Sequence, residues 1–329
     1  MEYFLQHPVP IPWFWMDVFT VLVTLLVVVF VVRKSKHPAV ILLECFGFVF
    51  LYAGVFENFA AVNGWYIYGR SLLMFGDVPL SVPLIEMDVL VTGLWMLEKM
   101  DVPDWCKPFI VGLLGMLQDF SLDPVATRQV FTMVGTTSGR WTWLTPAGHV
   151  NIFGIPVYNW SGWMLIMLYA SAYLLIGRWG FRRSGYKPAV GYAYPFIAIV
   201  LALLTMVSPL SQVLLWLAPF FAKGSSAEWI MLAFHLVFPT VLLAVLWRGR
   251  MKHPITLKGD FPVYAVPVLF HCADIYCAIA GGFQEVLWLV LLSSAAHFVL
   301  LGLIYYFSRR MGAAREKRAM PEQEPLLFA

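Results

Sequence analysis

Residues 118–124 read Gln118-Asp119-Phe120-Ser121-Leu122-Asp123-Pro124 and close an apolar segment that begins near residue 105. In a helix, the spacing of i and i+4 places the carboxylates of Asp119 and Asp123 on one face, about 6 Å apart along the axis. Pro124 is expected to end that helix, because the residue before a proline avoids the helical region. An Asp at the centre of a membrane helix costs about 2.5–3.5 kcal/mol on insertion scales. The sequence therefore predicts that both acids are sheltered inside the protein and functional.

The composition of the whole chain indicates a membrane protein. Of its 329 residues, 60% are hydrophobic and 12% are charged, and the mean hydropathy is +0.76. Soluble domains are about 25% charged. The net charge of +3 gives no reason to expect nucleic acid as a partner. The four cysteines form no Cys-x-x-Cys pair, and we interpret them as buried apolar thiols.

Nine apolar segments approach the length of about 20 residues that a transmembrane helix needs. They are 13–32, 38–57, 79–97, 105–123, 160–180, 192–217, 227–247, 261–281 and 284–307. The sixth contains Ser208-Pro209, where it could kink or split, so eight spans is the alternative count. We expect an all-α polytopic membrane protein, a bundle of about nine transmembrane helices. Residues 1–310 form the membrane domain, and 311–329 are expected to form a disordered cytoplasmic tail.

The basic residues predict how this bundle is oriented. With the N-terminus outside and the C-terminus in the cytoplasm, nearly all of the 22 Lys and Arg residues fall on the cytoplasmic side. The exceptions are Arg70, Arg128, Arg140 and Lys223. This bias is the one that the positive-inside rule describes.

With that orientation, further acids gather near the outer face. Glu57 ends the second span, and Glu86 and Asp88 lie about two turns into the third. Glu86 and Asp88, at i and i+2, cannot both face one site, and Glu86 is the preferred catalytic candidate. Asp274 lies about 10 Å below the outer end of the eighth span, with His271 on the same face, and both are candidates for substrate binding.

Two outer loops, 58–78 and 125–158, are rich in aromatic residues and are expected to lie over the acids. Trp and Tyr commonly form a belt at the membrane interface. Because the aromatic residues of these loops are expected to lie above the acids, substrate binding is an equally weighted alternative to a role in the interfacial belt. The candidate binding residues of these loops and of the helix that follows are Tyr66, Tyr68, Trp141, Trp143, Asn159 and Trp163.

Five short motifs follow one another between residues 44 and 180. They are Glu57 with Gly64, Tyr66 and Tyr68; Asp119 with Leu122-Asp123-Pro124; Gly139-x-Trp141-x-Trp143; Gly154-x-Pro156; and Asn159-x-x-Gly162-Trp163. In this order they resemble the membrane carotenoid-biosynthesis family that includes the carotenoid 1',2'-hydratases of the bacterioruberin and myxoxanthophyll type. The resemblance implies a hydro-lyase of the prokaryotic cell (inner) membrane that adds water to the terminal C=C bond of an acyclic carotenoid. It implies no cofactor and no metal. The implied partners are an acyclic carotenoid or other long isoprenoid, membrane lipid and other enzymes of carotenoid biosynthesis.

The residues suit this reaction independently of the resemblance. Protonating an alkene needs a carboxylic acid that keeps its proton near neutral pH, which burial and a neighbouring carboxylate favour. Water then captures the tertiary carbocation, which aromatic faces can stabilise. We expect Asp119 or Asp123 to be the acid and Glu57 or the other Asp to be the base, with Asn159 holding the water.

Three other functions stay open from the sequence. A lycopene-cyclase-like enzyme would begin with the same protonation and close a ring. A UbiA-like prenyltransferase would use Asp-x-x-x-Asp motifs to hold Mg²⁺ and diphosphate, but this chain has one such motif, facing outward and without a basic cluster. A proton-coupled transporter would use the acids as a relay and show paired halves, which the sequence lacks. The sequence does not decide the exact substrate, whether one or both ends react, which acid donates the proton, or the oligomeric state.

Overall fold

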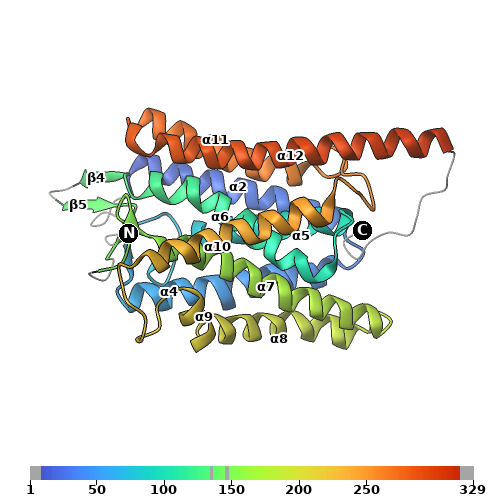
Figure 1. Ribbon diagram of the computed structural model, residues 1–329, viewed down its shortest axis with the longest axis horizontal. Helices are drawn as coiled ribbons and strands as arrows, with labels where there is room; N and C mark the ends of the chain where they lie inside the picture. The colour runs from blue at the N-terminus through green and yellow to red at the C-terminus, as the bar shows by residue number, and fades with distance from the viewer. Residues whose placement is uncertain (1–8, 134–135, 145–147, 319–329) are drawn as a thin grey trace.

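The computed structural model describes residues 9–133, 136–144 and 148–318, and these form an all-α polytopic membrane protein. In this part of the chain, eight helical segments are long and apolar enough to cross a membrane, and they lie along the long axis of the molecule (Figure 1). Four of them are single helices: α2 (Ile11–Lys34), α7 (Val157–Arg183), α8 (Pro188–Met206) and α11 (Phe261–Ala280). The segment Pro38–Val62 consists of α3 (Pro38–Gly47), a π-helical turn (Phe48–Ala53) and α4 (Gly54–Val62). The other three are Asp104–Ala126, which is mainly α6 (Lys107–Ala126), Ser226–Trp247, which is mainly α10 (Ser226–Leu242), and Gln284–Gly312, which is part of α12 (Gln284–Arg318).

The third predicted span is a further long helix, α5 (Ser81–Lys99), in the interior of the bundle. Almost every residue from Ser81 to Glu98 is buried, because α2, α6 and α11 all pack against this helix. It carries Glu86, Asp88 and Glu98, so it is less apolar than a helix that faces lipid. Neighbouring helices shield these acids from hydrocarbon, where they would be costly. Of the nine predicted spans, eight thus correspond to helices that are long and apolar enough to cross a membrane, and the third corresponds to the more polar helix α5.

The sixth predicted span, 192–217, is divided. Helix α8 ends at Met206, and a separate short helix, α9 (Pro209–Leu214), follows it. Ser208 has extended backbone angles, as the residue before a proline prefers, and Pro209 begins α9. The hydroxyls of Ser208 and Ser211 donate to the Thr205 carbonyl at 2.6 and 2.7 Å. The Ser208 N–H also donates to this carbonyl, at 3.2 Å, so several donors meet at the end of α8.

Pro124 does not end the fourth span, contrary to expectation. Helix α6 continues to Ala126, and the Thr127 N–H donates to the Asp123 carbonyl at 3.0 Å. Pro124 has no N–H to donate to the Phe120 carbonyl, but α6 continues through it as an α-helix. Asp119 and Asp123 therefore stay on one regular helical face.

Helix α12 runs to Arg318, so the expectation of a disordered tail from residue 311 is wrong for residues 311–318. The segment has no proline before Pro321, and its Ala, Arg, Lys and Glu residues are good helix formers. Residues 319–329 lie outside the described part of the chain.

Short antiparallel strand pairs form the loops at the end of the bundle marked by β4, β5 and the N label in Figure 1. They are β1 (Tyr66–Tyr68) with β6 (Trp141–Trp143), β2 (Met74–Phe75) with β3 (Val78–Pro79), β4 (Val130–Met133) with β5 (Thr136–Gly139), and β7 (Asn151–Ile152) with β8 (Ile155–Pro156). Three pairs are local hairpins. The pair β1–β6 joins the two predicted aromatic loops.

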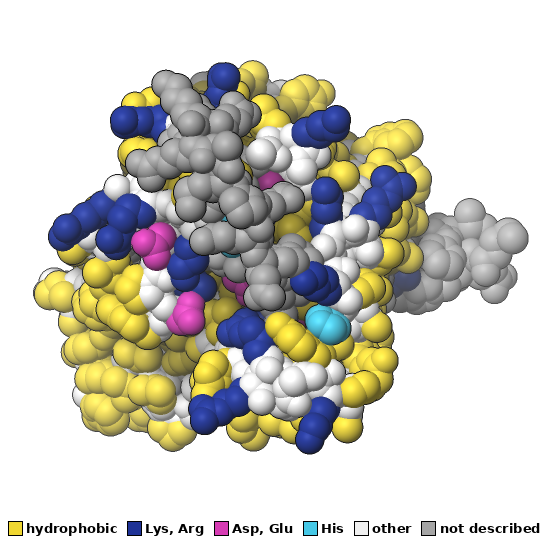
Figure 2. All heavy atoms as spheres, turned by 90° about the vertical axis from the view of Figure 1, so that its right-hand side faces the viewer, with side chains coloured by type: hydrophobic (Ala, Val, Ile, Leu, Met, Phe, Trp, Pro, Cys, Tyr) yellow, Lys and Arg dark blue, Asp and Glu magenta, His cyan; other side chains and the backbone are white. Residues whose placement is uncertain are grey.

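The opposite end of the bundle carries a ring of Lys and Arg side chains (Figure 2). Arg33 and Lys34 end α2, and Arg182 and Arg183 end α7. The positive-inside rule assigns this end to the cytoplasm, which leaves the strand pairs on the outer side.

A buried ion-pair cluster joins α3, α5 and α7 in the cytoplasmic half. Arg178 of α7 is fully buried; it donates to Glu44 Oε1 through Nε at 2.9 Å and to Glu98 Oε1 through Nη1 at 3.2 Å. Its Nη2 contacts the second oxygen of Glu44. The Tyr194 hydroxyl also donates to Glu44, at 2.5 Å. The cluster therefore pairs two buried acids with one buried guanidinium.

Candidate active site

Three buried carboxylates meet beneath the outer strands, from Glu57 on α4 and from Asp119 and Asp123 on α6. They line a space of about 30 Å³. The other residues that line it are Tyr66, Tyr68, Val82, Trp141, Trp143, Asn159 and Trp163. We call this set the acid cage. The structure thus brings together nine residues that the sequence proposes for catalysis or binding.

Asp123 is surrounded by donors. Its carboxylate accepts hydrogen bonds from Trp143 Nε1 at 3.0 Å and from Asn159 Nδ2 at 2.7 Å, and Trp141 Nε1 donates to the other oxygen. The two indoles belong to alternate residues of β6, whose side chains point to the same face of a strand. The Trp-x-Trp spacing is therefore what aims both N–H groups at one acid.

Glu57 is held in the same way by β1. The hydroxyls of Tyr66 and Tyr68 donate to Glu57 Oε2 at 2.5 and 2.7 Å. Burial raises the pKa of both phenols well above the usual value, and the charge of Glu57 adds to this effect. Both tyrosines therefore keep their protons and act as donors.

The pairing of β1 with β6 aligns the two sets of donors. Tyr66 lies opposite Trp143, with ring centroids 4.7 Å apart, and Tyr68 lies opposite Trp141, with centroids 5.8 Å apart. Both ring pairs meet edge to face, a favourable geometry for aromatic side chains. One two-stranded ribbon therefore covers the acids with four donors and an aromatic wall.

Asp119 differs from its two neighbours. Its Oδ2 accepts a hydrogen bond from Asn159 Nδ2 at 2.7 Å, so this amide bridges Asp119 and Asp123. Its Oδ1 is buried and has no hydrogen-bond partner among the described residues. Of the two aspartates in the cage, Asp119 is the one with a carboxyl oxygen to which no donor is directed.

Glu86 and Asp88 have different surroundings, as their spacing predicts. Asp88 Oδ2 accepts a hydrogen bond from Thr24 Oγ1 at 2.9 Å, away from the cage. Both carboxyl oxygens of Glu86 are buried and without a hydrogen-bond partner in the described chain. Burial and the charge of Glu57 raise the pKa of Tyr66 most, and the charge of Glu86 raises it further. Glu86 therefore lies near the cage without lining it.

His271 and Asp274 do not line the cage. Asp274 accepts hydrogen bonds from Ser121 Oγ at 2.7 Å and from Gln118 Nε2 at 3.2 Å. At about 100° per residue, those donors lie on a different face of α6 from the two aspartates. His271 Nε2 lies 3.0 Å from His297 Nδ1, between α11 and α12. Both residues belong to interhelical packing outside the cage.

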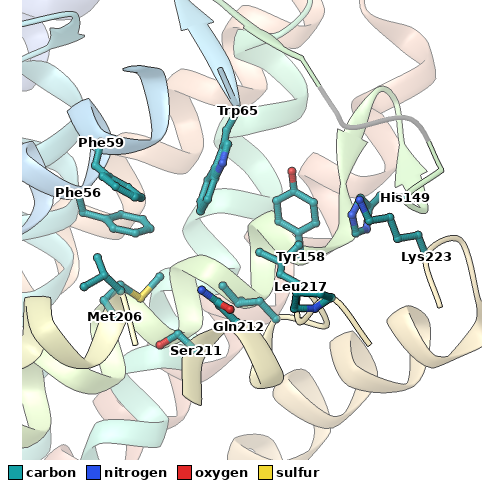
Figure 3. A pocket seen from close by; sticks show the side chains of 13 residues that line it. Phe56, Phe59, Trp65, His149, Tyr158, Met206, Ser211, Gln212, Leu217 and Lys223 are labelled. Atoms are coloured by element: carbon teal, nitrogen blue, oxygen red, sulfur yellow. The ribbon is translucent and has the colours of Figure 1, made fainter. Parts of the chain in front are cut away.

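A larger cavity of about 310 Å³ lies beside the cage (Figure 3). It is lined by Phe56, Phe59, Trp65, His149, Tyr158, Met206, Val207, Ser211, Gln212, Leu215, Leu217, Pro219 and Lys223. These residues come from α4, α7, the end of α8, α9 and three loops. Most of them were not singled out in the sequence, because no local spacing links segments so far apart. We call this space the lateral cavity.

Replacing Tyr66 by Phe is expected to lower the free energy of unfolding by about 1–3 kcal/mol, because buried Glu57 loses the shorter of its two phenol bonds. Thermal unfolding in detergent measures the change. Tyr276→Phe is the matched control, since Tyr276 is 71% exposed on α11. Equal stability of the two variants would contradict this account of Glu57.

Compared with known proteins, the chain matches no family model, no curated protein and no solved structure. Its function is therefore argued from the acid cage and the cavity beside it.

Proposed function

We propose that this protein is a membrane hydro-lyase that adds water to the terminal double bond of a long acyclic isoprenoid, with an acyclic carotenoid as the leading candidate. It needs no cofactor and works in the cell membrane of a prokaryote. The observation that carries the proposal is the contrast between Asp119, which has an oxygen without a donor, and Asp123, which has three donors.

The hydrogen bonds suggest how two acids one helical turn apart divide the work. An ionised carboxylate only accepts hydrogen bonds, whereas a protonated one also donates. Three N–H donors around Asp123 suit the ionised form. The unpartnered Oδ1 of Asp119 suits a protonated oxygen. We therefore assign Asp119 as the general acid and Asp123 as the base.

The reaction then balances without a redox partner. The O–H bond of Asp119 breaks as a C–H bond forms at the less substituted carbon of the terminal double bond, which leaves a tertiary carbocation at the more substituted carbon. A water oxygen bonds to this cation, and its proton passes to Asp123. The proton returns to Asp119, which lies next to Asp123 under the shared amide of Asn159. The faces of Trp141, Trp143 and the cage tyrosines supply electron density near the cation.

The polar lining of the cage suits a bound water molecule. A space of about 30 Å³ exceeds the roughly 10–15 Å³ that one water molecule needs on this measure, and a buried water needs polar partners such as these acids. Ring closure would instead require the folded end of the substrate to fill the space beside the acids. The lycopene-cyclase-like alternative has no comparable support.

Expression of the chain in a host that makes an acyclic carotenoid tests the proposal. Mass analysis of the pigments is expected to show the mass of one added water molecule for each modified end. A pigment of unchanged mass but altered chromatographic mobility would indicate cyclisation instead. Unchanged pigments, with the protein present in the membrane, would contradict the proposal.

A further inference from the structure

The lateral cavity and the acid cage are separated by a third, small space. A narrow space of about 30 Å³ lies between them and shares lining residues with both. With the lateral cavity it shares Phe56, Trp65, Tyr158, Met206 and Leu215. With the acid cage it shares Glu57, Tyr66, Trp143, Asn159 and Trp163. The three spaces are therefore neighbours, in order from the lateral cavity to the acids.

The lateral cavity suits the end of a long apolar chain. Phe56 and Phe59 lie side by side above Met206, and Trp65 reaches into the same space (Figure 3). A volume of about 310 Å³ is at the lower limit of typical small-molecule sites, about 300–1,000 Å³, so it accommodates part of a long isoprenoid. Phe59 is 46% exposed on the outside of α4, so the cavity lies close to the lipid-facing surface.

Gly162 of α7 lines the connecting space. A Cβ placed there would meet no heavy atom within 4 Å beyond its own turn of helix. By contrast, a Cβ at Gly112 of α6 would lie 2.3 Å from Met164 Sδ, so that glycine is required for helix packing. A glycine inside a helix costs about 0.5–1 kcal/mol relative to alanine. Close packing therefore does not require a glycine here, and Gly162 differs from the equally uncrowded Gly180 in that it lines the connecting space.

We propose that the lateral cavity binds the terminal segment of an acyclic isoprenoid, which enters from the bilayer between α4 and α9 and passes Gly162 to reach Asp119. The identity of the bound isoprenoid rests on the proposed function, but the existence of the passage does not. Gly162 is thus a specificity-determining position, because its missing side chain admits a branched chain end to the cage.

The test uses the full protein in phospholipid vesicles with a saturated isoprenoid hydrocarbon that carries a diazirine at its terminal carbon. After irradiation, adducts are mapped by mass spectrometry. In the wild type and in Gly162→Ala, we expect adducts on the lateral cavity, such as Gln212, and on the cage, such as Asp119. In Gly162→Leu, cage adducts are expected to fall about tenfold or more, because the larger side chain fills the passage, while adducts on Gln212 persist.

Gly180→Leu is the matched control. It places the same substitution on the same helix at a position where a Cβ also meets no atom within 4 Å, but outside all three spaces. It is expected to label like the wild type. If Gly162→Leu does not fold, as judged by thermal unfolding, Gly162→Met blocks the passage with a more flexible side chain.

Three results would overturn the proposal. The first is an unchanged amount of cage adducts in the folded Gly162→Leu or Gly162→Met variant, and the second is the absence of adducts on the lateral cavity in the wild type. The third is equal labelling of both sites by a diazirine phospholipid that the isoprenoid does not displace. The saturated probe cannot be hydrated. Labelling as expected without any hydrated product would therefore refute the proposed reaction and leave the passage established.

Discussion

Asp119→Asn is expected to reduce product formation by about 10²–10⁴-fold, the usual contribution of a general acid, while the protein stays folded in the membrane. Asn has nearly the same shape as Asp, and its carbonyl oxygen can still accept the 2.7 Å hydrogen bond from Asn159. It cannot deliver a proton to carbon. Mass analysis of hydrated pigment in membranes with equal amounts of each variant measures the loss.

Asp88→Asn is the matched control, because Asp88 is equally buried but bonds to Thr24 outside the cage. It is expected to keep wild-type turnover. Asp123→Asn adds a second comparison. Its amide N–H₂ would face at least one of the N–H groups that now donate to the carboxylate, so both activity and stability are expected to fall. Full turnover by Asp119→Asn would remove Asp119 from the mechanism.

Arg178→Met is expected to cause the largest loss of stability, about 3–5 kcal/mol in the free energy of unfolding. The guanidinium holds Glu44 and Glu98 together in the interior, and its removal leaves two buried carboxylates without their cation. Thermal and denaturant unfolding in detergent measure the effect. The control is Arg183→Met, an exposed arginine in the last turn of the same helix, which is expected to change stability little.

Two further changes separate loss of pairing from loss of packing around Arg178. Adding Glu44→Gln and Glu98→Gln to Arg178→Met removes the unpaired charges, and most of the lost stability is expected to return. If the triple variant is no more stable than Arg178→Met, the arginine acts through packing rather than through charge.

The spacing of residues in the sequence predicted the members of the acid cage because most of them come in short motifs. Asp119 and Asp123 share a helical face at i and i+4, and the alternate residues of Tyr-x-Tyr and Trp-x-Trp share a strand face. Which of these faces meet is a long-range property. The pairing of Tyr66 with Trp143 and the hydrogen bonds of Asn159 to both aspartates are not visible in any short window.

The same limit applies to the residues that lie outside the cage. His271 and Asp274 lie on one face of α11, as predicted, but helix packing directs that face toward α12 and another side of α6. Hydropathy alone did not reveal that α5 is enclosed by other helices. The lateral cavity is formed by residues from several helices and loops, so no single motif marks it.

The ribbon β1–β6 also has a consequence for biogenesis. Its strands lie on either side of α5 and α6 in the chain, so the ribbon closes only after both of these helices have been inserted and both loops exported. Asp119 and Asp123 are translated before Trp141, Trp143 and Asn159, which supply the hydrogen bonds that they accept. The acid cage is therefore complete only after helices on both sides of it have been inserted.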